Sequence, residues 1–297
     1  MNYNSNQAGN AGKNFSAKLM IQKEEYKQTL VEYVKSQYTG TQGENSLYYH
    51  DSTLVNGAGD NSYRYAGASE SVNNYICLGS DAITCPDANL FRIIGVFGEQ
   101  VKVIRAKSVG SQFWDTSGSN TWSTSSLNTY LNGEYLTSLG TLANKIVTTT
   151  WKVGGNVDSN IVVSVPKTAY QNEIVNPVIR NTTDNKTEYS AKIGLMYVSD
   201  YYYGASPSAW TLVGYNSDYS KSYASAKGEN WLYGGGCDWT ITRDSGGSNR
   251  AFYVSDYGYV RNVFVSNGYG VRPSFSLESS TTYVSGSGSA SDPIVIN

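Results

Sequence analysis

Short β-type segments separated by turn-forming residues dominate the last hundred residues, and this feature most constrains the fold. Apolar and β-branched runs alternate there with clusters of Gly, Asn and Ser, residues that favour turns. The strands predicted from these runs are Trp239–Arg243, Phe252–Ser255, Tyr259–Val265 and Val271–Leu277. Strands this short and this closely spaced, with helical patterns upstream, predict an α+β domain that contains a meander.

The helical patterns lie in the first half of the chain. Apolar residues from Phe15 to Tyr38 recur at steps of three, four and seven, the period of an amphipathic helix, and Gly40 and Gly43 follow it. A second helix is expected from Trp122, where hydroxyl side chains can cap it, to a stop at Gly133. Residues 135–146 are expected to hold a further short helical piece.

Two further strand regions are predicted. Leu90–Val103 indicates two strands joined at Gly98-Glu99, because apolar residues lie on both sides of a Gly turn. Ile193–Val198 indicates a buried strand that leads to a helix capped by Ser199-Asp200. The sheet is expected to form mainly from residues after Ile193, within one α+β domain.

Composition divides the chain into four regions. Residues 1–14 are polar and expected to be disordered, residues 15–40 form the amphipathic helix, and residues 41–280 form the folded domain. Residues 281–297 form a Gly/Ser-rich tail that ends in the apolar strand Ile294–Ile296.

Charge and polarity exclude two classes of partner. The formal net charge is −2 and no basic cluster is present, so we expect no nucleic-acid binding. No apolar run approaches the roughly 20 residues needed to cross a bilayer, so we expect no membrane insertion. Only 15% of residues are charged while 26 are Tyr, a bias common in extracellular β-rich proteins, and we predict an extracellular location on a bacterial surface or a phage particle.

The N-terminal residues carry no export signal. Residues 1–13 lack the apolar core of a signal peptide. Either an exporting or anchoring segment lies outside this sequence, or the protein reaches the outside as part of a particle.

Cysteine spacing predicts one disulfide. Cys77 and Cys85 flank a segment that contains the turn formers Gly79-Ser80-Asp81. A bridge would close a short loop and stabilise the fold by about 2–3 kcal/mol; the alternative is two reduced, buried thiols. Cys237 remains unpaired, and no Cys-x-x-Cys spacing indicates a metal site.

Residues for nucleophilic or zinc chemistry are scarce. The single histidine, His50, would have to serve any Ser-His-Asp or Cys-His triad, and it lies in a turn-like stretch far from Cys237 in sequence. We interpret it as a surface or capped histidine. Catalytic zinc would need His or Cys ligands that this chain hardly has.

Motifs for phosphate, calcium and glycan chemistry are also weak. No G-x-x-x-x-G-K-[ST] motif for phosphate binding occurs. Asp115–Asn120 begins like a calcium-binding loop, but its twelfth position is Ser126, where the loop needs a bidentate Glu. Carboxylates that could pair in a glycan-active enzyme are Asp200, Asp238, Asp244 and Asp256. None lies in a recognisable motif. We therefore predict a protein that is not an enzyme and that uses no cofactor or metal, with a glycan-active enzyme as a minor alternative.

Aromatic residues crowd the region between residues 197 and 269. They alternate with Asn, Ser, Asp and Gly, a combination typical of binding surfaces that use rigid aromatic contacts and adaptable hydrogen bonds. The aromatic set is Tyr201, Tyr202, Tyr203, Trp210, Tyr215, Tyr219, Tyr223, Trp231, Tyr233, Trp239, Tyr253, Tyr257, Tyr259 and Tyr269. We expect Trp231, Trp239 and Tyr253 in the core, and Tyr233, Tyr257 and Asn262 exposed.

The closing segment resembles a known family. The matching stretches are Trp231–Arg243, Ala251–Val254, Gly258 and Gly270–Pro273, with upstream similarity over Asn74–Phe97, Trp122–Leu131 and Ile193–Asp200. These stretches look like bacterial C-type-lectin-like domains of the formylglycine-generating-enzyme type, which include retroelement-diversified variable proteins and Firmicutes surface or pilin-like proteins. The resemblance implies small antiparallel sheets with two or three helices over residues 41–280.

Two departures from that family limit what the resemblance implies. The calcium-ligand motifs of animal lectins are absent, and Cys237 has no near partner to form the catalytic cysteine pair of the oxidase members. What the resemblance implies is therefore the fold and a binding face built from the loops between Tyr233 and Asn262.

These observations predict a non-catalytic adhesin or receptor-binding domain that binds a cell-surface protein or a glycan. The residues expected to form one exposed binding face are Tyr233, Asp238, Arg243, Asp244, Asn249, Arg250, Tyr257, Tyr259, Arg261 and Asn262. The alternative is a structural subunit of a pilus or fibre, assembled as a homo-oligomer through the helix Phe15–Tyr38. A binding module should keep that helix packed on its own domain, whereas a polymer subunit should expose its apolar stripe.

Overall fold

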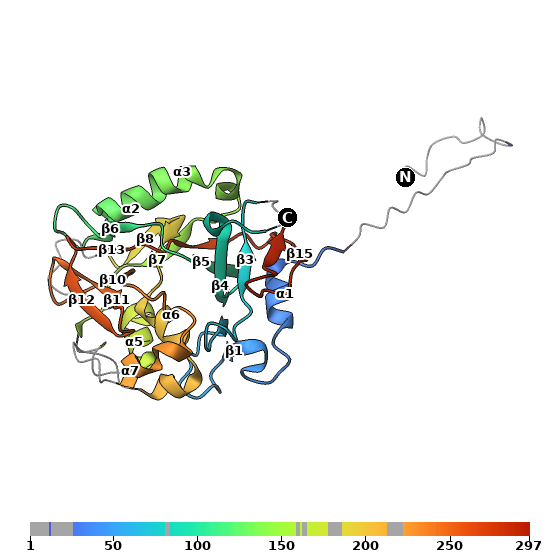
Figure 1. The fold of residues 1–297 in the computed structure, drawn as a ribbon, viewed down its shortest axis with the longest axis horizontal. Helices are drawn as coiled ribbons and strands as arrows, with labels where there is room; N and C mark the ends of the chain where they lie inside the picture. The colour runs from blue at the N-terminus through green and yellow to red at the C-terminus, as the bar shows by residue number, and fades with distance from the viewer. Residues whose placement is uncertain are drawn as a thin grey trace.

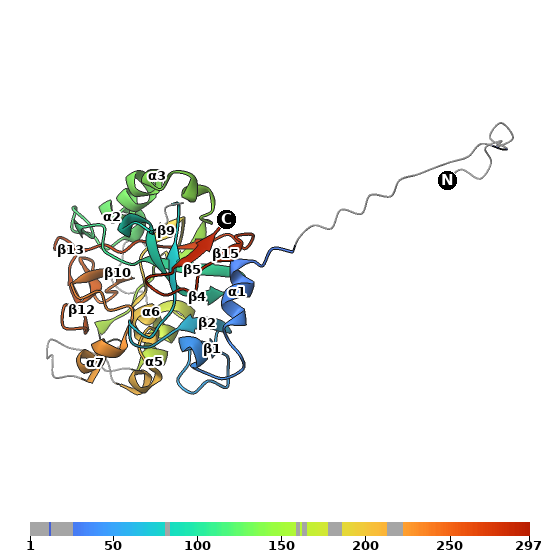
Figure 2. The same cartoon turned by 45° about the vertical axis from the view of Figure 1, so that its right-hand side comes forward.

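The computed structural model describes residues 12, 26–80, 84–158, 161, 165–177, 186–212 and 222–297. Within them, short helices and several small sheets combine in an α+β arrangement (Figure 1, Figure 2). The predicted disorder of residues 1–14, apart from Gly12, and the predicted helix over residues 15–25 lie outside the described residues.

The largest sheet in the part of the chain that the structure describes has nine strands. Seven follow one another in hydrogen-bonded order: β15 (Tyr283–Ser285), β16 (Ile294–Ile296), β3 (Tyr75–Cys77), β4 (Leu90–Phe97), β5 (Gln100–Arg105), β14 (Ser274–Leu277) and β9 (Ile193–Gly194). The other two are β2 (Ser62–Tyr65), which pairs with β4, and β1 (Leu47–His50), which pairs with β2. The pairs are antiparallel except for β16 with β3.

The predicted hairpin at residues 90–103 is confirmed and forms the centre of this sheet. β4 and β5 pair antiparallel around Gly98, whose φ of 62° suits a tight turn. Six successive residues of β4, Phe91–Val96, are buried, as expected for a continuous apolar run. The expectation that the sheet forms mainly after Ile193 was therefore wrong: the strongest apolar run takes the central position, and five of the nine strands precede residue 106.

The C-terminal strands build mostly a second sheet. Its hydrogen-bonded order is β12 (Val260–Phe264), β11 (Arg250–Val254), β10 (Asp238–Arg243), β13 (Gly268–Gly270) and β6 (Ser111–Phe113). β10 and β13 run parallel, and the other pairs are antiparallel. The predicted strand Val271–Leu277 is shorter than expected: residues 271–273, which follow β13, lie in no strand, and Ser274–Leu277 forms β14 in the larger sheet. A two-stranded sheet joins β7 (Thr149–Lys152) to β8 (Glu188–Ala191).

The helices are shorter and more numerous than the two or three expected. The α-helices are α1 (Leu30–Ser36), α2 (Ser126–Tyr130), α3 (Leu136–Ser138), α5 (Pro166–Tyr170), α6 (Val198–Tyr203) and α7 (Ser222–Ser225). The 3₁₀ turns are η2 (Glu44–Ser46), η3 (Asp87–Asn89), η4 (Trp122–Thr124), η6 (Gly140–Asn144), η8 (Pro207–Thr211) and η9 (Ala226–Glu229), and the π turns are η5 (Leu131–Tyr135) and η7 (Gln171–Val175).

Local hydrogen bonds correct three predicted helix boundaries. Residues 26–28 are not helical, and Thr29 caps α1 by accepting from the backbone N–H of Glu32. Gly133 does not end the second helix, because it lies inside η5 and the helical path continues into α3. The cap of α6 is Tyr197 rather than Ser199-Asp200, and α6 therefore begins where the strand Ile193–Val198 was expected to finish.

One contiguous hydrophobic core joins residues from both halves of the chain. It contains Leu30 and Val34 of α1, strands of the first two sheets, and Ile294 of the terminal strand β16. The regions predicted as a helix before residue 41 and a tail after residue 280 thus pack into the same core. All six Trp side chains are fully buried in the structure.

The segments around residues 28 and 297 meet at one corner of the molecule. Leu30 N–H donates to the Thr281 carbonyl at 2.7 Å, and Tyr283 N–H donates to the Gln28 carbonyl at 2.9 Å. Asn297 N–H donates to the Thr282 carbonyl at 3.0 Å. Both views place α1 and β15 at this corner and β12 on the opposite side of the molecule (Figure 1, Figure 2).

The predicted disulfide is present. Cys77 and Cys85 are bridged, and Cys237 is a free, partly buried cysteine. The bridge lies at the end of β3, where it closes the loop between β3 and β4. Among the described residues, no helix combines the length and the apolar character that a membrane span requires.

Candidate functional site

The ten sequence-predicted binding residues do not form one cluster. Those near the β11–β12 turn are Tyr233, Asp238, Tyr257 and Tyr259, with Arg261 close by opposite Tyr253. Those near the β10–β11 turn, at the other end of the strands, are Arg243, Asp244, Asn249, Arg250 and Asn262. Arg261 and Asn262 are neighbours on β12, but successive strand residues point to opposite faces of the sheet, so even these two do not share one surface.

Four of the ten are buried, which corrects the expectation that all are exposed. Asp238, Arg243, Asp244 and Tyr259 are 5%, 2%, 7% and 4% exposed. Arg243 Nε donates to the Gly154 carbonyl at 3.0 Å, and Asp238 forms an ion pair with buried Arg272 at 3.8 Å. These charges hold segments of the fold together, because a buried ionic group needs a partner.

The group near the β10–β11 turn forms a hydrogen-bonded polar network. Asn262 Nδ2 donates to Asp244 Oδ2 at 2.6 Å, and Arg250 donates to Asn262 Oδ1 at 3.2 Å. The Arg250 guanidinium also lies 4.5 Å from the centre of the Phe264 ring. Burial raises the pKa of Asp244, while its hydrogen bonds act in the opposite direction. The network is partly exposed, and its polar groups already form hydrogen bonds with one another.

A second group of aromatic side chains lies on one face of the five-stranded sheet, around buried Tyr253 and partly exposed Tyr269. Tyr253 pairs directly with both Trp239 and Arg261, so these three side chains point to the same face. The rings of Tyr253 and Tyr269 stack 4.5 Å apart, and Tyr269 lies 4.9 Å from the Trp239 ring. Trp239 is fully buried beside them, while Tyr269 and Arg261 are partly exposed.

Another group of aromatic and charged side chains lies at the β11–β12 turn. The Lys227 ammonium lies 5.5 Å from the Tyr233 ring centre and 5.8 Å from that of Tyr257. Tyr233 donates to the Asp256 carbonyl, and Cys237 Sγ lies 3.9 Å from Asp256 Oδ1. We call the partly or fully exposed Tyr233, Tyr257, Arg261 and Tyr269, together with buried Tyr253, the tyrosine face.

Most of the other aromatic residues in this region fill the core. Trp231, Trp239 and Tyr253 are buried as predicted. Tyr201, Tyr202 and Tyr203 are fully buried as well, and the Tyr201 hydroxyl donates to the Gly258 carbonyl at 2.8 Å. Tyr can therefore replace Leu or Ile in this core when its hydroxyl finds a partner. Tyr215, Tyr219 and the side chain of Tyr223 lie outside the described residues.

His50 is not on the surface. It is fully buried and packs against the rings of Tyr203 and Trp210, with centres 4.9 and 5.1 Å away. Its Nδ1 accepts a hydrogen bond from the Ala58 backbone N–H at 3.0 Å. Burial lowers the pKa of His50 well below its ordinary value, with nearby Arg64 acting in the same direction. His50 is therefore a neutral core residue.

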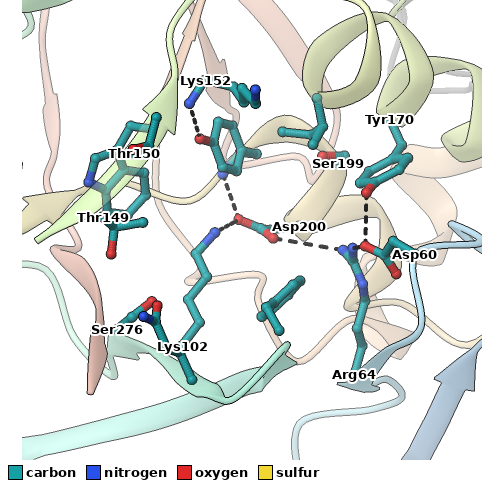
Figure 3. Close-up of a pocket in the computed structure, with 15 residues that line it drawn as sticks. Asp60, Arg64, Lys102, Thr149, Thr150, Lys152, Tyr170, Ser199, Asp200 and Ser276 are labelled. Atoms are coloured by element: carbon teal, nitrogen blue, oxygen red, sulfur yellow. Dashed lines mark hydrogen bonds and ion pairs between the residues drawn. The ribbon is translucent and has the colours of Figure 1, made fainter. Parts of the chain in front are cut away.

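A cavity of about 210 Å³ lies between the large sheet, β7 and the helices α5 and α6 (Figure 3). Four charged side chains of its lining form one group: Asp60, Arg64, Lys102 and Asp200. Lys102 comes from β5, Arg64 from β2 and Asp200 from the first turn of α6. Arg64, Lys102 and Asp200 are 2%, 7% and 3% exposed.

Two glycines allow the elements around this cavity to approach one another. Gly95 lies beside Arg64 where β2 pairs with β4, and a Cβ at Gly95 would come within 2.1 Å of the Tyr63 carbonyl oxygen. A Cβ at Gly194 would come within 2.8 Å of the Trp151 ring. Any larger residue at either position would push β2 or β7 away from the cavity.

The charged groups form a connected network. Lys102 Nζ lies 2.5 Å from Asp200 Oδ2, and an Arg64 nitrogen lies 3.9 Å from Asp200 Oδ1 (Figure 3). Arg64 also pairs with Asp60 at 2.5 Å, and the Tyr170 hydroxyl donates to Asp60 at 2.8 Å. Burial raises the pKa of Asp60, but Arg64 and hydrogen bonds outweigh it and hold the pKa below its ordinary value.

Aromatic rings surround the Lys102 ammonium. Its Nζ lies 4.6 Å from the Tyr197 ring centre, 5.4 Å from Trp151 and 5.6 Å from Phe97. Burial lowers the pKa of Lys102, and the neighbouring Asp200 carboxylate partly compensates. The rings and the carboxylate together hold the ammonium in a fixed position.

Glu173 supports the start of α6 from the other side. It is 1% exposed and accepts hydrogen bonds from the backbone N–H groups of Val198 and Ser199, at 3.2 and 2.9 Å. The Thr242 hydroxyl donates to the same carboxyl. Burial raises the pKa of Glu173. The first turn of α6, which carries Asp200, is thus fixed by side chains on both sides.

Sequence reasoning considered Asp200 but missed Lys102 and Arg64. A signal was present, since Lys102 lies between two Val residues and Arg64 between two Tyr residues, and a cation in such a setting is buried only when paired. Their partners lie far away in sequence, so spacing could not identify them. Within the described ranges, no group of three or more His, Cys, Asp or Glu side chains is placed to hold a metal ion.

Comparison of the chain with protein-family models, with curated proteins and with solved structures finds no match in any of the three.

Proposed function

We propose that this chain is a non-catalytic ligand-binding domain of C-type-lectin-like fold, displayed outside the cell on a bacterial surface or a phage particle. Its ligand is a cell-surface protein or glycan that lies on the tyrosine face. The observation that carries the proposal is the concentration of aromatic and cationic side chains here: Tyr253 stacks on Tyr269 and pairs with Arg261, and Lys227 lies against the rings of Tyr233 and Tyr257.

The chemistry of the tyrosine face suits recognition. Tyrosine presents a large rigid area together with a hydroxyl group and loses little rotamer freedom on binding, and Arg is enriched among residues that dominate affinity. Tyr257 is 44% exposed, and the buried Trp239 ring packs against Tyr253 and Tyr269. A ligand would meet a preformed aromatic surface.

Three further features favour a displayed binding module. Leu30 and Val34 of α1 are buried on their own domain, which supports a binding module over a fibre subunit that would expose this helix. The Cys77–Cys85 disulfide suits an oxidising environment. The corner formed by α1 and β15 lies opposite β12, so attachment there would leave the five-stranded sheet accessible (Figure 1).

The proposal is tested with a glycan and cell-surface protein array probed with the purified chain and three variants. Tyr257→Ala and Arg261→Ala should each weaken binding at least about tenfold, with little change in melting temperature. Phe264→Ala is the matched control, because Phe264 is 47% exposed but lies three residues from Arg261 on the same strand, on the opposite face. Equal losses in all three variants, or losses that follow unfolding, would reject the tyrosine face as the binding site.

A further inference from the structure

The cavity at Lys102 has unused hydrogen-bonding capacity that the tyrosine face does not explain. An ammonium group offers three N–H donors. Among the described residues, the only hydrogen bond from the Lys102 ammonium goes to Asp200. The ammonium nitrogen Nζ also lies over the faces of aromatic rings. A desolvated ammonium with spare donors favours an additional oxygen acceptor.

A second polar group at the cavity also has spare capacity. The Oγ1 atom of Thr149, which lines the cavity, is buried and has no hydrogen-bond partner in the described part of the chain. A buried hydroxyl without a partner costs free energy that a bound acceptor would recover. Figure 3 shows Thr149 and Lys102 lining the same cavity. Rotation of the Thr149 hydroxyl toward the cavity would let both groups donate to one ligand.

The existing ion pairs determine which charge the ligand can carry. The two carboxylates, Asp60 and Asp200, already accept from Arg64, Lys102, Tyr170 and the backbone N–H of Tyr197. A cationic ligand would have to displace one of these cations from its partner. An anionic oxygen needs only the donors that remain on Lys102 and Thr149.

The rest of the lining is apolar and the space is small. Phe97, Trp151 and Ile174 contribute rings and an aliphatic side chain to the walls. The volume of about 210 Å³ is below the range of about 300–1,000 Å³ that is usual for drug-sized ligands. The walls therefore suit a short apolar body attached to one polar head.

We propose that this cavity is a binding site for a small monocarboxylate, with the carboxylate held by Lys102 Nζ and the Thr149 hydroxyl and the apolar body against Phe97 and Trp151. The ammonium supplies a charge-assisted hydrogen bond, which is stronger than a neutral one. Arg64 stays paired with Asp60 and keeps Asp200 in place between the two cations.

The experiment measures binding of matched pairs of probes to the full chain by isothermal titration and ligand-observed NMR. The probes are butyrate with butyramide and benzoate with benzamide, which differ in charge but hardly in shape. Each carboxylate should bind at least about tenfold more tightly than its amide, because only the carboxylate forms the charge-assisted bond. Equal affinity within each pair, or no binding by any probe, would overturn the proposal.

Variants locate the site. Lys102→Met should abolish carboxylate binding, whereas Lys107→Met, which removes an exposed lysine from outside the cavity, should not change it. Thr149→Val removes a hydroxyl that has no partner among the described residues, so it should weaken binding several-fold without lowering the melting temperature. If Lys102→Met does not fold, the Thr149→Val variant alone tests whether the carboxylate binds in this cavity. Unchanged carboxylate affinity in Thr149→Val would then refute the assignment of the cavity.

Discussion

Lys102→Met should be among the most destabilising single substitutions in this chain, because it removes the closest cation from a buried carboxylate. Lys102 Nζ lies 2.5 Å from Asp200 Oδ2, and both side chains are nearly inaccessible to water. With an effective dielectric constant of about 20, two unit charges at this separation attract by about 7 kcal/mol before desolvation is counted.

Two features of the structure reduce the net cost. Arg64 remains 3.9 Å from the other oxygen of Asp200, and the Tyr197 N–H continues to donate to the carboxylate. Methionine also keeps an apolar stem among the rings that surround position 102. We therefore expect Lys102→Met to lower the free energy of unfolding by about 3–5 kcal/mol, the usual cost of leaving one buried charge without its partner.

The measurement is urea unfolding at neutral pH, followed by the fluorescence of the buried Trp side chains. Asp200→Asn and the double variant complete a double-mutant cycle, and Asn keeps the acceptor for the Tyr197 N–H. Removing both charges should cost less than the sum of the single changes by about 2 kcal/mol. Additive losses, or a loss below about 1 kcal/mol for Lys102→Met, would show that the pair is not the stabilising contact inferred here.

Acid and thiol chemistry provide two further predictions. Because the folded-state pKa of Asp60 lies below its ordinary value, this carboxylate stabilises the fold above about pH 4, and that stability is lost as the pH falls through the folded pKa. Acid unfolding of Asp60→Asn should be correspondingly shallower than that of the wild type, and identical curves would contradict this. Replacing Cys77 and Cys85 by Ser should cost about 2–3 kcal/mol in urea, given a loop of 8 residues. The denatured, unreduced wild type should expose one free thiol, that of Cys237; three would disprove the bridge.

Local sequence patterns predicted the individual elements better than their assembly. The hairpin at residues 90–103 was predictable because its apolar runs and Gly98 act over a few residues. The change of sheet between β13 and β14 was not, since it depends on the pairing of β13 with β6 and of β14 with β5, each more than 150 residues earlier. Strand pairing over such separations leaves no periodic signal in one sequence.

In the candidate site, too, features set by local sequence were predictable and features set by distant contacts were not. Loop residues such as Tyr257 were placed correctly because turn formers keep them near solvent. Arg243 and Asp238 have the same polar character in sequence, but they are buried because Gly154 and Arg272 happen to reach them. The cavity at Lys102 could not be derived at all, because three separate elements contribute its charges. Burial of a charged residue is decided by its partner, and the partner is a property of the tertiary fold.

The meeting of residues 28–30, 281–283 and 297 at one corner has a mechanical consequence. A domain whose two end segments are hydrogen-bonded neighbours can be grafted into a surface loop of another protein without separating the flanking ends of that loop. Tension transmitted through such a host would load the few backbone hydrogen bonds at Thr281–Tyr283 first. The five-stranded sheet, on the far side of the molecule, would stay unstrained while its host is stretched.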